Sequence, residues 1–338
     1  MTAAQRRGLP RRTIRRLMIL GLLLLACLLG FGFSLNMGAL DLSFSRVLAA
    51  MFGDPQGTPH QIIYNIRLPR TLVAALVGVC LSLSGCLLQA VMRNPLAAPH
   101  IIGVSAGAGL AGIFVLILYP GAYYLLTPAA FAGAVATTTL IYLLAWRQGL
   151  EPNRLILAGV AVSSLLGAGI TAMMVFYPDR VHSVLGFMIG GLSARSWTHF
   201  QTILPYAAVG FIWANLTAYR LNILLLGDDI ASGLGIHLER TRLMFIALAS
   251  LLAASAVSVA GLLGFVGLMV PHMTRLIIGS DYRFLLPASA LFGAALLMIC
   301  DTVARVIMEP VELPVGIIMS ILGAPFFLYL LRTSMRET

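Results

Sequence analysis

The chain has 338 residues, of which 59% are hydrophobic and only 10% are charged. A soluble domain carries about 25% charged residues, so the composition excludes an ordinary water-soluble protein and predicts a polytopic membrane protein. All 22 basic residues are arginines, and the sequence contains no lysine. Because the phosphate-binding loop of P-loop ATPases needs a lysine, the composition also excludes that class of enzyme.

The N-terminal segment joins a cluster of arginines to the first apolar run. Residues 6–16 hold six arginines, and the apolar run covers 17–35. A secretory signal peptide begins in the same way, but this run is longer than a typical signal core and no A-x-A cleavage site follows it. We therefore expect an uncleaved membrane helix with its arginines in the cytoplasm. The pattern of 41–53 then predicts a short amphipathic helix on the membrane surface.

Further apolar runs follow along the chain, and a membrane helix needs roughly 20 apolar residues. The run at 265–278 is short and contains Pro271, which favours a broken or buried helix. With the first run, the sequence predicts an all-α protein of about ten transmembrane helices. The nine later spans lie near 71–92, 101–118, 124–146, 155–176, 200–219, 243–262, 265–278, 284–307 and 314–331.

Ten spans place both chain ends on one side of the membrane, and the arginines agree with this topology. With both ends in the cytoplasm, 16 arginines face the cytoplasm and 6 face outside, as the positive-inside rule requires. The six outside are Arg46, Arg67, Arg70, Arg180, Arg195 and Arg305.

A faint repeat links the two halves of the chain. Segment 84–103 aligns with 260–279 at an offset of 176 residues, which places Pro95 over Pro271. The matches are few, and chance is the alternative explanation. The offset spans five predicted helices, and an odd number would invert the second copy, a layout common in transporters.

The sequence shows no pattern typical of a metal site. The four cysteines lie in apolar runs without a C-x-x-C spacing, which indicates buried thiols rather than a disulfide framework or a zinc site. The six histidines are scattered, and no H-E-x-x-H motif occurs, which disfavours a polytopic membrane metalloenzyme. The cysteines are Cys27, Cys80, Cys86 and Cys300.

Small residues cluster on two successive spans. At such spacing they let membrane helices approach closely. For any single glycine, helix packing is the simpler interpretation, but as a set they predict a tightly packed bundle that lines a path. They are Gly78, Ser82, Ser84 and Gly85 on the first span, and Gly103, Ser105, Gly107, Gly109 and Gly112 on the second. Between the spans, Pro95 and Pro99 predict a loop.

The longest predicted cytoplasmic loop covers 220–242. Asp228 or Asp229 is expected to cap a short helix there, and Gly233 or Gly235 to end it. Such a helix would form a docking site for a soluble partner. The alternative is a solvated connector.

Three arginines on the predicted outer face run against the charge trend. Arg67 and Arg70 precede the second span, and Arg305 lies near the outer end of the ninth. They could reach lipid phosphates or pair with carboxylates on an external partner. Asp301 stands four residues before Arg305, which also predicts an ion pair within one helix.

Several longer motifs occur in order from about residue 60 to the C-terminus. In the first half they are Arg67-Leu68-Pro69-Arg70, Ser84-Gly85 with Gln89, Arg93-Asn94-Pro95-Leu96-Ala97 and Gly103-Val104-Ser105-Ala106-Gly107-Ala108. In the second half they are 264–275, 285–287, 301–305, 312–316 and 323–327. Taken together, these motifs resemble one family, the membrane subunits of ABC importers for iron-siderophores, haem and cobalamin.

The resemblance implies a type II ABC importer permease fold, with 1–338 as a single transmembrane domain of two inverted-repeat-like halves. It implies two permease subunits, here a homodimer, with the translocation path between them. An ATPase dimer that carries ATP and magnesium would dock on 220–242, and a periplasmic or lipid-anchored substrate-binding protein would dock outside. The chain itself would hold no cofactor, no metal and no nucleic acid, and it would lie in the bacterial cytoplasmic (inner) membrane.

Site residues follow by position within the matching motifs. The resemblance implies binding-protein docking on Arg67, Arg70 and Arg305. It implies ATPase coupling through Gly227, Asp228, Asp229, Ala231, Leu234 and Gly235. Residues of the translocation path would include Asn94, Pro95, Ser105, Gly107 and Gly109. The expected cargo is a ferric siderophore first, haem second and cobalamin third.

A rival hypothesis is an ion-coupled secondary transporter. Such proteins carry ionisable groups inside the membrane as coupling sites. Asp301 is the main candidate carboxylate in this sequence, and Arg305 is its predicted neighbour.

Overall fold

The computed structural model describes residues 11–38, 57–146 and 152–334, and in these ranges helices joined by turns make up the chain. The predicted surface helix at 41–53 and the first arginines lie outside the described residues. Each of the ten predicted spans overlaps one helix of 13 or more residues, so the all-α polytopic fold is confirmed. These helices are α1 (Arg11–Asn36), α4 (Leu68–Val91), α5 (Val104–Leu118), α6 (Leu126–Ala145), α7 (Pro152–Phe176), α9 (Trp197–Leu216), α12 (Leu238–Ala260), α13 (Val266–Ile278), α14 (Tyr282–Val306) and α15 (Val315–Ser334).

Shorter helices connect the long ones. Nine-residue α8 is one that the sequence did not predict, because it is too short to give the signal of a membrane span. The connecting elements are α3 (Thr58–Ile62), the π-helix η1 (Ile63–Arg67), the 3-10 helices η2 (Pro99–Ile102), η3 (Tyr123–Leu125) and η4 (Pro178–Arg180), and α8 (Val181–Ile189), α10 (Ala218–Leu224) and α11 (Asp228–Gly233).

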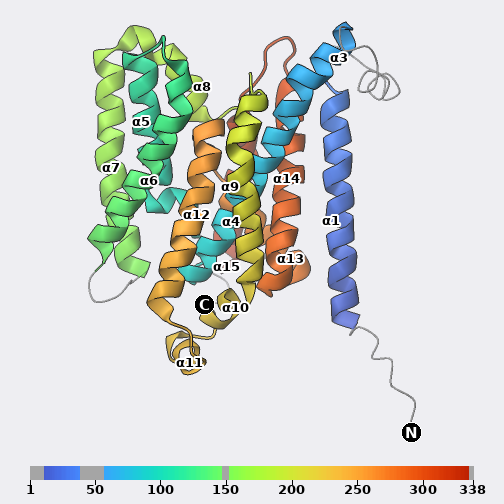
Figure 1. The fold of residues 1–338 in the computed structure, drawn as a ribbon, viewed down its shortest axis with the longest axis vertical. Coiled ribbons are helices and arrows are strands. Elements are labelled where there is room, and N and C mark those ends of the chain that lie inside the picture. Colours follow the sequence, from blue (N-terminus) through green and yellow to red (C-terminus); the bar gives the residue numbers. More distant parts are fainter. Residues whose placement is uncertain (1–10, 39–56, 147–151, 335–338) are drawn as a thin grey trace.

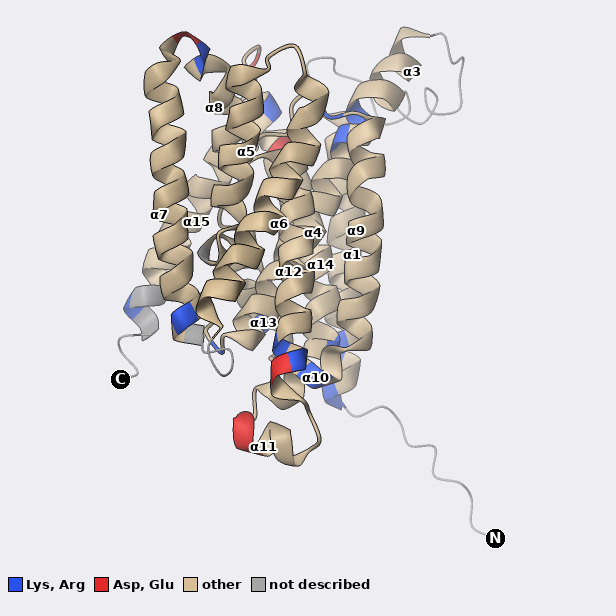
Figure 2. Ribbon diagram, turned by 60° about the vertical axis from the view of Figure 1, so that its left-hand side comes forward, with Lys and Arg blue, Asp and Glu red and all other residues tan. Residues whose placement is uncertain are grey.

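The helices form one bundle with two distinct ends (Figure 1). The start of α1, helix α11 and the end of α15 lie at one end, which we call the α11 end, and α3 lies at the opposite, α3 end. Within the described residues, six helical stretches are long and apolar enough to cross a membrane, and α5, α13 and α15 are shorter apolar helices. Charged residues gather at the two ends and leave the middle uncharged (Figure 2), as a membrane-spanning protein requires.

Helix α4 is the central helix of the bundle. Nearly all of its residues are buried, and it packs against α9, α12, α13 and α14. Two glycines bring its backbone into contact with neighbouring backbones. A Cβ at Gly78 would overlap the carbonyl of Gly293 on α14, and a Cβ at Gly85 would overlap the carbonyl of Gly267 on α13. The glycines of this span therefore serve close helix packing.

Replacing Gly85 by alanine is expected to lower the apparent melting temperature of the purified protein by roughly 5 °C. The added methyl group has no space, because a backbone oxygen rather than a flexible side chain occupies it. Gly21→Ala on α1 is the matched control, since nothing lies within 4 Å of a Cβ there, and alanine is the better helix former. Equal melting temperatures for the two variants would contradict the packing described for α4.

Backbone hydrogen bonds between helix ends and the non-helical residues beside them join three distant segments. The Leu262 amide donates to the Phe187 carbonyl at 2.9 Å, the Gly191 amide to the Ala260 carbonyl at 2.8 Å, and the Gly316 amide to the Gly190 carbonyl at 3.0 Å. These bonds tie the end of α8, the α12–α13 connection and the start of α15 together. We call residues 187–191, 260–263 and 314–316 the backbone junction. Non-helical backbone is tolerated inside a membrane bundle when its polar groups are paired in this way.

The predicted offset of 176 residues between the halves is wrong. Pro95 lies in a turn, whereas Pro271 lies inside α13, so the two segments do not share local structure. The short helices α5 and α13 correspond better. Each begins directly after a residue in the left-handed conformation, Gly103 with φ 74° and Phe265 with φ 65°, and each follows a long buried helix.

Candidate functional site

The three arginines predicted for the outer face lie together at the α3 end. Arg67 ends η1, Arg70 lies in the first turn of α4 and Arg305 lies near the end of α14. Their exposed fractions are only 4%, 5% and 7%. These three residues, which we call the arginine cluster, are therefore not free surface groups, and each one is bound within the chain.

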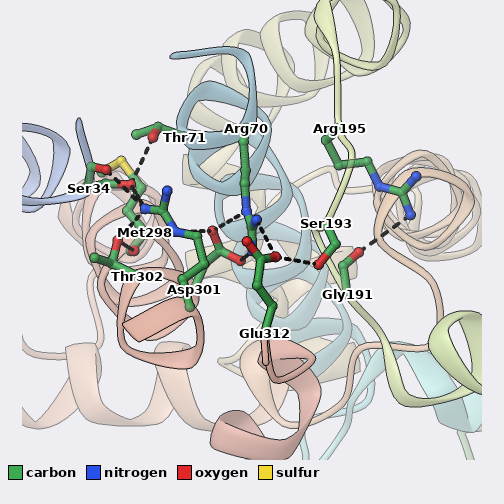
Figure 3. A network of polar contacts seen from close by, with 11 residues as sticks. Ser34, Arg70, Thr71, Gly191, Ser193, Arg195, Met298, Asp301, Thr302 and Glu312 are labelled. Atoms are coloured by element: carbon green, nitrogen blue, oxygen red, sulfur yellow. Dashed lines mark hydrogen bonds and ion pairs between the residues drawn. The ribbon is translucent and has the colours of Figure 1, made fainter. Parts of the chain in front are cut away.

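Arg70 is the centre of the cluster (Figure 3). Its Nε and Nη2 donate to the two carboxylate oxygens of Asp301 at 2.9 and 3.0 Å, and its Nη1 donates to Glu312 Oε2 at 2.8 Å. The two-pronged geometry is the strong form of an arginine–carboxylate pair. The predicted pair between Asp301 and Arg305 also exists, with 3.8 Å between Asp301 Oδ2 and Arg305 Nε. It is the looser of the two contacts of Asp301.

Arg67 and Arg305 bind the end of α1. Arg67 Nη1 donates to the carbonyls of Leu35 and Asn36, both at 2.9 Å. Arg305 Nη2 donates to the Ser34 carbonyl at 2.9 Å and to the Ser34 hydroxyl at 3.1 Å. The last carbonyls of a helix have no partner within it and carry its negative pole. The C-terminal end of α1 therefore stabilises two cations without an acidic side chain.

The cluster lines a hollow of about 470 Å³ at the α3 end. The side chain of Glu312 is 45% exposed there, and its Oε2 also accepts a hydrogen bond from the Ser193 hydroxyl at 3.0 Å. Partial burial alone would raise the pKa of Glu312, but the hydrogen bond and charge of Arg70 outweigh it and lower the pKa. In the sequence, Glu312 belongs to the motif 312–316 but no role of its own was predicted for it, and Ser193 was not predicted at all. An acid in the last connection before α15 was the available signal.

At the α11 end, α10 positions the connection that carries α11. The Asn222 side chain donates to Asp281 Oδ1 and accepts from the Tyr282 amide, both at 2.9 Å. Arg16 of α1 donates to Asp281 Oδ2 at 3.2 Å. These bonds hold α10 against the start of α14 and leave α11 projecting from the bundle (Figure 1).

The predicted short helix exists as α11, but neither aspartate caps it. Gly227 is the N-cap residue, and its φ of 110° is a backbone conformation that favours glycine. No side chain caps the helix. The end of the helix is as predicted, because Gly233 is its last residue and Gly235 follows with φ 78°. The prediction of an aspartate cap is wrong because Asp228 binds arginines instead.

Asp228 joins three segments of the α11 end. Arg242 of α12 donates to its two carboxylate oxygens at 2.8 and 3.0 Å, and Arg93 of the α4–α5 connection pairs with it as well. Arg93 Nε also donates to the Leu224 carbonyl at 3.1 Å. Partial burial would raise the pKa of Asp228, but the two arginines outweigh it and lower the pKa. Asp229, by contrast, is exposed.

Three aliphatic side chains face outward around α11. Leu226, Ile230 and Leu234 are 55%, 54% and 58% exposed, and we call them the α11 tip. Ala231 is buried and anchors the helix. An apolar group at the polar end of a membrane bundle is typical of a surface that another protein covers.

The residues predicted for the translocation path are not gathered in one place. Gly107 lies in the contact between α5 and α6, where a Cβ would overlap the Gly133 carbonyl, and a Cβ at Gly109 would approach Ile170 and Leu262. Asn94 Oδ1 accepts from the Leu96 amide at 2.8 Å. Pro95 is exposed and Ser105 half-buried. Helix packing accounts for Gly107, and the path assignment of the set stays a prediction.

No group of metal-ligating side chains occurs in the part of the chain that the structure describes. The four cysteines are unpaired, and Cys80, Cys86 and Cys300 are buried. Asp301, the carboxylate considered for ion coupling, is 1% exposed and is held by Arg70. This engagement gives no support to a role as an ion-coupling site.

The bundle, its uncharged middle and its two differently built ends define a polytopic membrane protein of the permease class. The model of the FecCD transport family matches residues 22–333, and the chain belongs to this family. It is 40% identical over 322 residues to the Fe(3+)-citrate import system permease protein YfmD of Bacillus subtilis, covering 95% of this chain and 96% of that protein. It is 39% identical over 328 residues to the hemin transport system permease protein HmuU of Yersinia pestis, covering 94% and 95%.

A solved structure supports the same fold. A metal-chelate type ABC transporter in an inward-facing conformation superimposes with a TM-score of 0.84 at 29% identity, covering 94% of this chain and 99% of that one. The expectation of a permease of the type II ABC importer class is therefore confirmed. The alternative of an ion-coupled secondary transporter has no counterpart among these proteins.

Proposed function

We propose that the chain is the permease subunit of an ATP-driven importer that moves an iron chelate into the cell by alternating access. The observation that carries this proposal is family membership over nearly the whole chain, together with relatives named for iron citrate and hemin import. A ferric siderophore or similar iron(III) chelate is the first candidate cargo, haem the second and cobalamin the third. The protein lies in the bacterial cytoplasmic membrane, with the α11 end and both termini on the cytoplasmic side.

The energy for transport comes from a partner. The chain contains no lysine and so has no P-loop of its own. An ATPase dimer, which holds ATP and magnesium, docks on the α11 end. The α11 tip offers the apolar contacts for this docking, and the residues from Gly227 to Gly235 transmit the movement.

A substrate-binding protein docks at the α3 end. Its carboxylates are received by the arginine cluster, whose three guanidinium groups line the hollow there. Each arginine of the cluster already has partners within the chain. A carboxylate of the binding protein would therefore have to compete with these internal partners.

A second copy of the chain completes the path. Helix α7 presents a stripe of small residues, including Ala161, Ser164, Ala168 and Ala172, and all four are exposed. Small residues at this spacing favour close packing against another membrane helix. Helix α15 also has an exposed apolar surface, with Ile321 and Leu328 among the exposed residues. We infer a homodimer with the path between the subunits, where Asn94, Pro95, Ser105, Gly107 and Gly109 would contribute.

The test of the function is uptake into liposomes that contain the permease, its ATPase and its binding protein. A ferric siderophore, haem and cobalamin are supplied separately. We expect ATP-dependent uptake of the ferric chelate and none with a non-hydrolysable ATP analogue. Uptake that follows a proton or sodium gradient without ATP would contradict the proposal.

Asp228→Asn is expected to lower the amount of substrate moved per ATP by about tenfold, a usual size for coupling between sites. The neutral amide cannot hold two guanidinium groups, so the link between the α4–α5 connection, α11 and α12 is lost. Glu239→Gln is the matched control, because Glu239 is an exposed acid in the first turn of α12, at the same end of the bundle but outside residues 227–235. Uptake and ATP hydrolysis measured in the same liposomes give the ratio, and equal ratios for the two variants would refute the coupling role of Asp228.

A further inference from the structure

Glu312 occupies the outward edge of the arginine cluster (Figure 3). It lies in the connection between α14 and α15, and its side chain is 45% exposed. Its Oε2 accepts one hydrogen bond from Arg70 Nη1 at 2.8 Å and one from the Ser193 hydroxyl at 3.0 Å. The remaining bonds of Arg70 go to Asp301, which is buried. The position on Arg70 that faces the hollow is therefore already filled by a carboxylate.

The charge of the hollow is balanced within the chain. The three arginines of the cluster carry +3, and Asp301, Glu309 and Glu312 carry −3, so the formal sum is 3 − 3 = 0. An incoming carboxylate that meets this set is not attracted by a net charge. The incoming carboxylate gains a strong, charge-assisted hydrogen bond from an arginine only if it replaces one of the chain's own carboxylates on that arginine.

Of the internal carboxylates, Glu312 is the one able to leave. Asp301 is buried and accepts two hydrogen bonds from Arg70. Moving it away from Arg70 would leave its negative charge buried without a counterion or water. Glu312 is half-exposed and can turn into water at small cost. Glu309 lines the same hollow and is exposed, but it makes no hydrogen bond to the cluster in the described structure.

We propose that Glu312 stands in for a carboxylate of the docked partner, and that docking exchanges one for the other on Arg70. The exchange breaks the bond from Ser193 and so releases the segment that joins α8 to α9. This inference rests on the proposed docking of a binding protein at the arginine cluster. In this inference, Glu312 competes with the partner's carboxylate for Arg70. Ser193 loses its hydrogen bond when Glu312 leaves.

The released segment leads directly to the backbone junction. Gly190 and Gly191 are bonded to the start of α15 and to the end of α12. The side chain of Arg195 returns to the Gly191 carbonyl and to His199 of α9, so Ser193 is the tie from this segment to Arg70 through Glu312. Glu312 itself precedes α15 by three residues. A change at the hollow therefore acts on the segments that meet at the backbone junction.

Hydrogen–deuterium exchange on the full-length permease with its ATPase in nanodiscs tests the release without any binding protein. Glu312→Ala and Ser193→Ala are expected to speed amide exchange over residues 191–195 roughly three- to tenfold, the effect of losing one hydrogen bond. Glu312→Gln should give a smaller increase, because its amide oxygen can still accept. Glu309→Gln is the matched control and should leave exchange unchanged. Unchanged exchange in both alanine variants, at normal stability, would overturn the proposal.

A glutamate-rich peptide tests the exchange of carboxylates directly. At millimolar concentration it should speed exchange over 191–195 in the native protein, and a glutamine-rich peptide of the same length should not. In Glu312→Ala the glutamate peptide should add nothing further. No effect of the glutamate peptide on the native protein would overturn the role of Glu312. The proposed docking would still stand if joint replacement of Arg70 and Asp301 by leucine abolished stimulation by the binding protein, so the two failures can be told apart.

Discussion

Replacing both Arg70 and Asp301 by leucine is expected to give a stable, assembled permease that no longer responds to its binding protein. Arg70→Leu alone leaves the Asp301 carboxylate buried without its partner, which costs about 3–5 kcal/mol, and the variant should be lost during purification. Removing both charges together is close to neutral for stability, because Asp301 and Arg70 are 1% and 5% exposed and lie in well-packed surroundings.

The double variant separates docking from folding. Charge reversal at all three arginines cannot do so, because it would place new carboxylates beside Asp301. Thermal stability of the complex and ATPase activity with and without the binding protein are the two measurements. We expect a melting temperature within a few degrees of that of the native complex. We also expect the same ATPase activity with and without the binding protein. Normal stimulation in the stable double variant would show that Arg70 does not receive the partner.

Replacing Leu226, Ile230 and Leu234 by alanine is expected to abolish co-purification of the ATPase. These side chains are more than half exposed, and full burial of one such side chain contributes roughly 1.5–3 kcal/mol. If docking buries the exposed half of each, the three together contribute about 3 kcal/mol, or roughly a hundredfold in affinity. The fold of the permease should not change, because α11 projects from the bundle.

Leu22, Leu25 and Leu29 on α1 provide the control for the α11 tip. They are equally exposed aliphatic residues on a helix that is apolar enough to span the membrane, so their replacement by alanine should leave ATPase binding intact. Affinity purification through a tag on the permease, followed by quantification of the ATPase, compares the two variants. Retention of the ATPase by the α11 tip variant would move the docking surface elsewhere on the α11 end.

The sequence predicted those features that depend on local pattern. Each apolar run contains a helix of the bundle, and the motifs around Arg70 and Asp228 led to the prediction of a docking surface at each end. The features that were missed depend on contacts between distant segments. Arg70 is 231 positions from Asp301 and 242 positions from Glu312, so neither the burial of the cluster nor these pairings has a local signal.

Three errors have specific physical causes. The aspartate cap of α11 was wrong because Asp228 gains more from two arginines, one of them 135 positions away, than from a backbone amide. The offset between the halves was wrong because proline can lie in a turn at one position and inside a helix at another. Helix α8 was missed because nine residues cannot give the signal of a span.

The end of α1 has a consequence for how the arginine cluster is held together. The carbonyls of Ser34, Leu35 and Asn36 act as the counterion for Arg67 and Arg305. The end of α1 thus forms an acceptor site for arginines from distant parts of the sequence, and Arg305 comes 271 residues after Ser34. Helix α1 is therefore more than an anchor, because its last carbonyls hold two of the three arginines of the cluster.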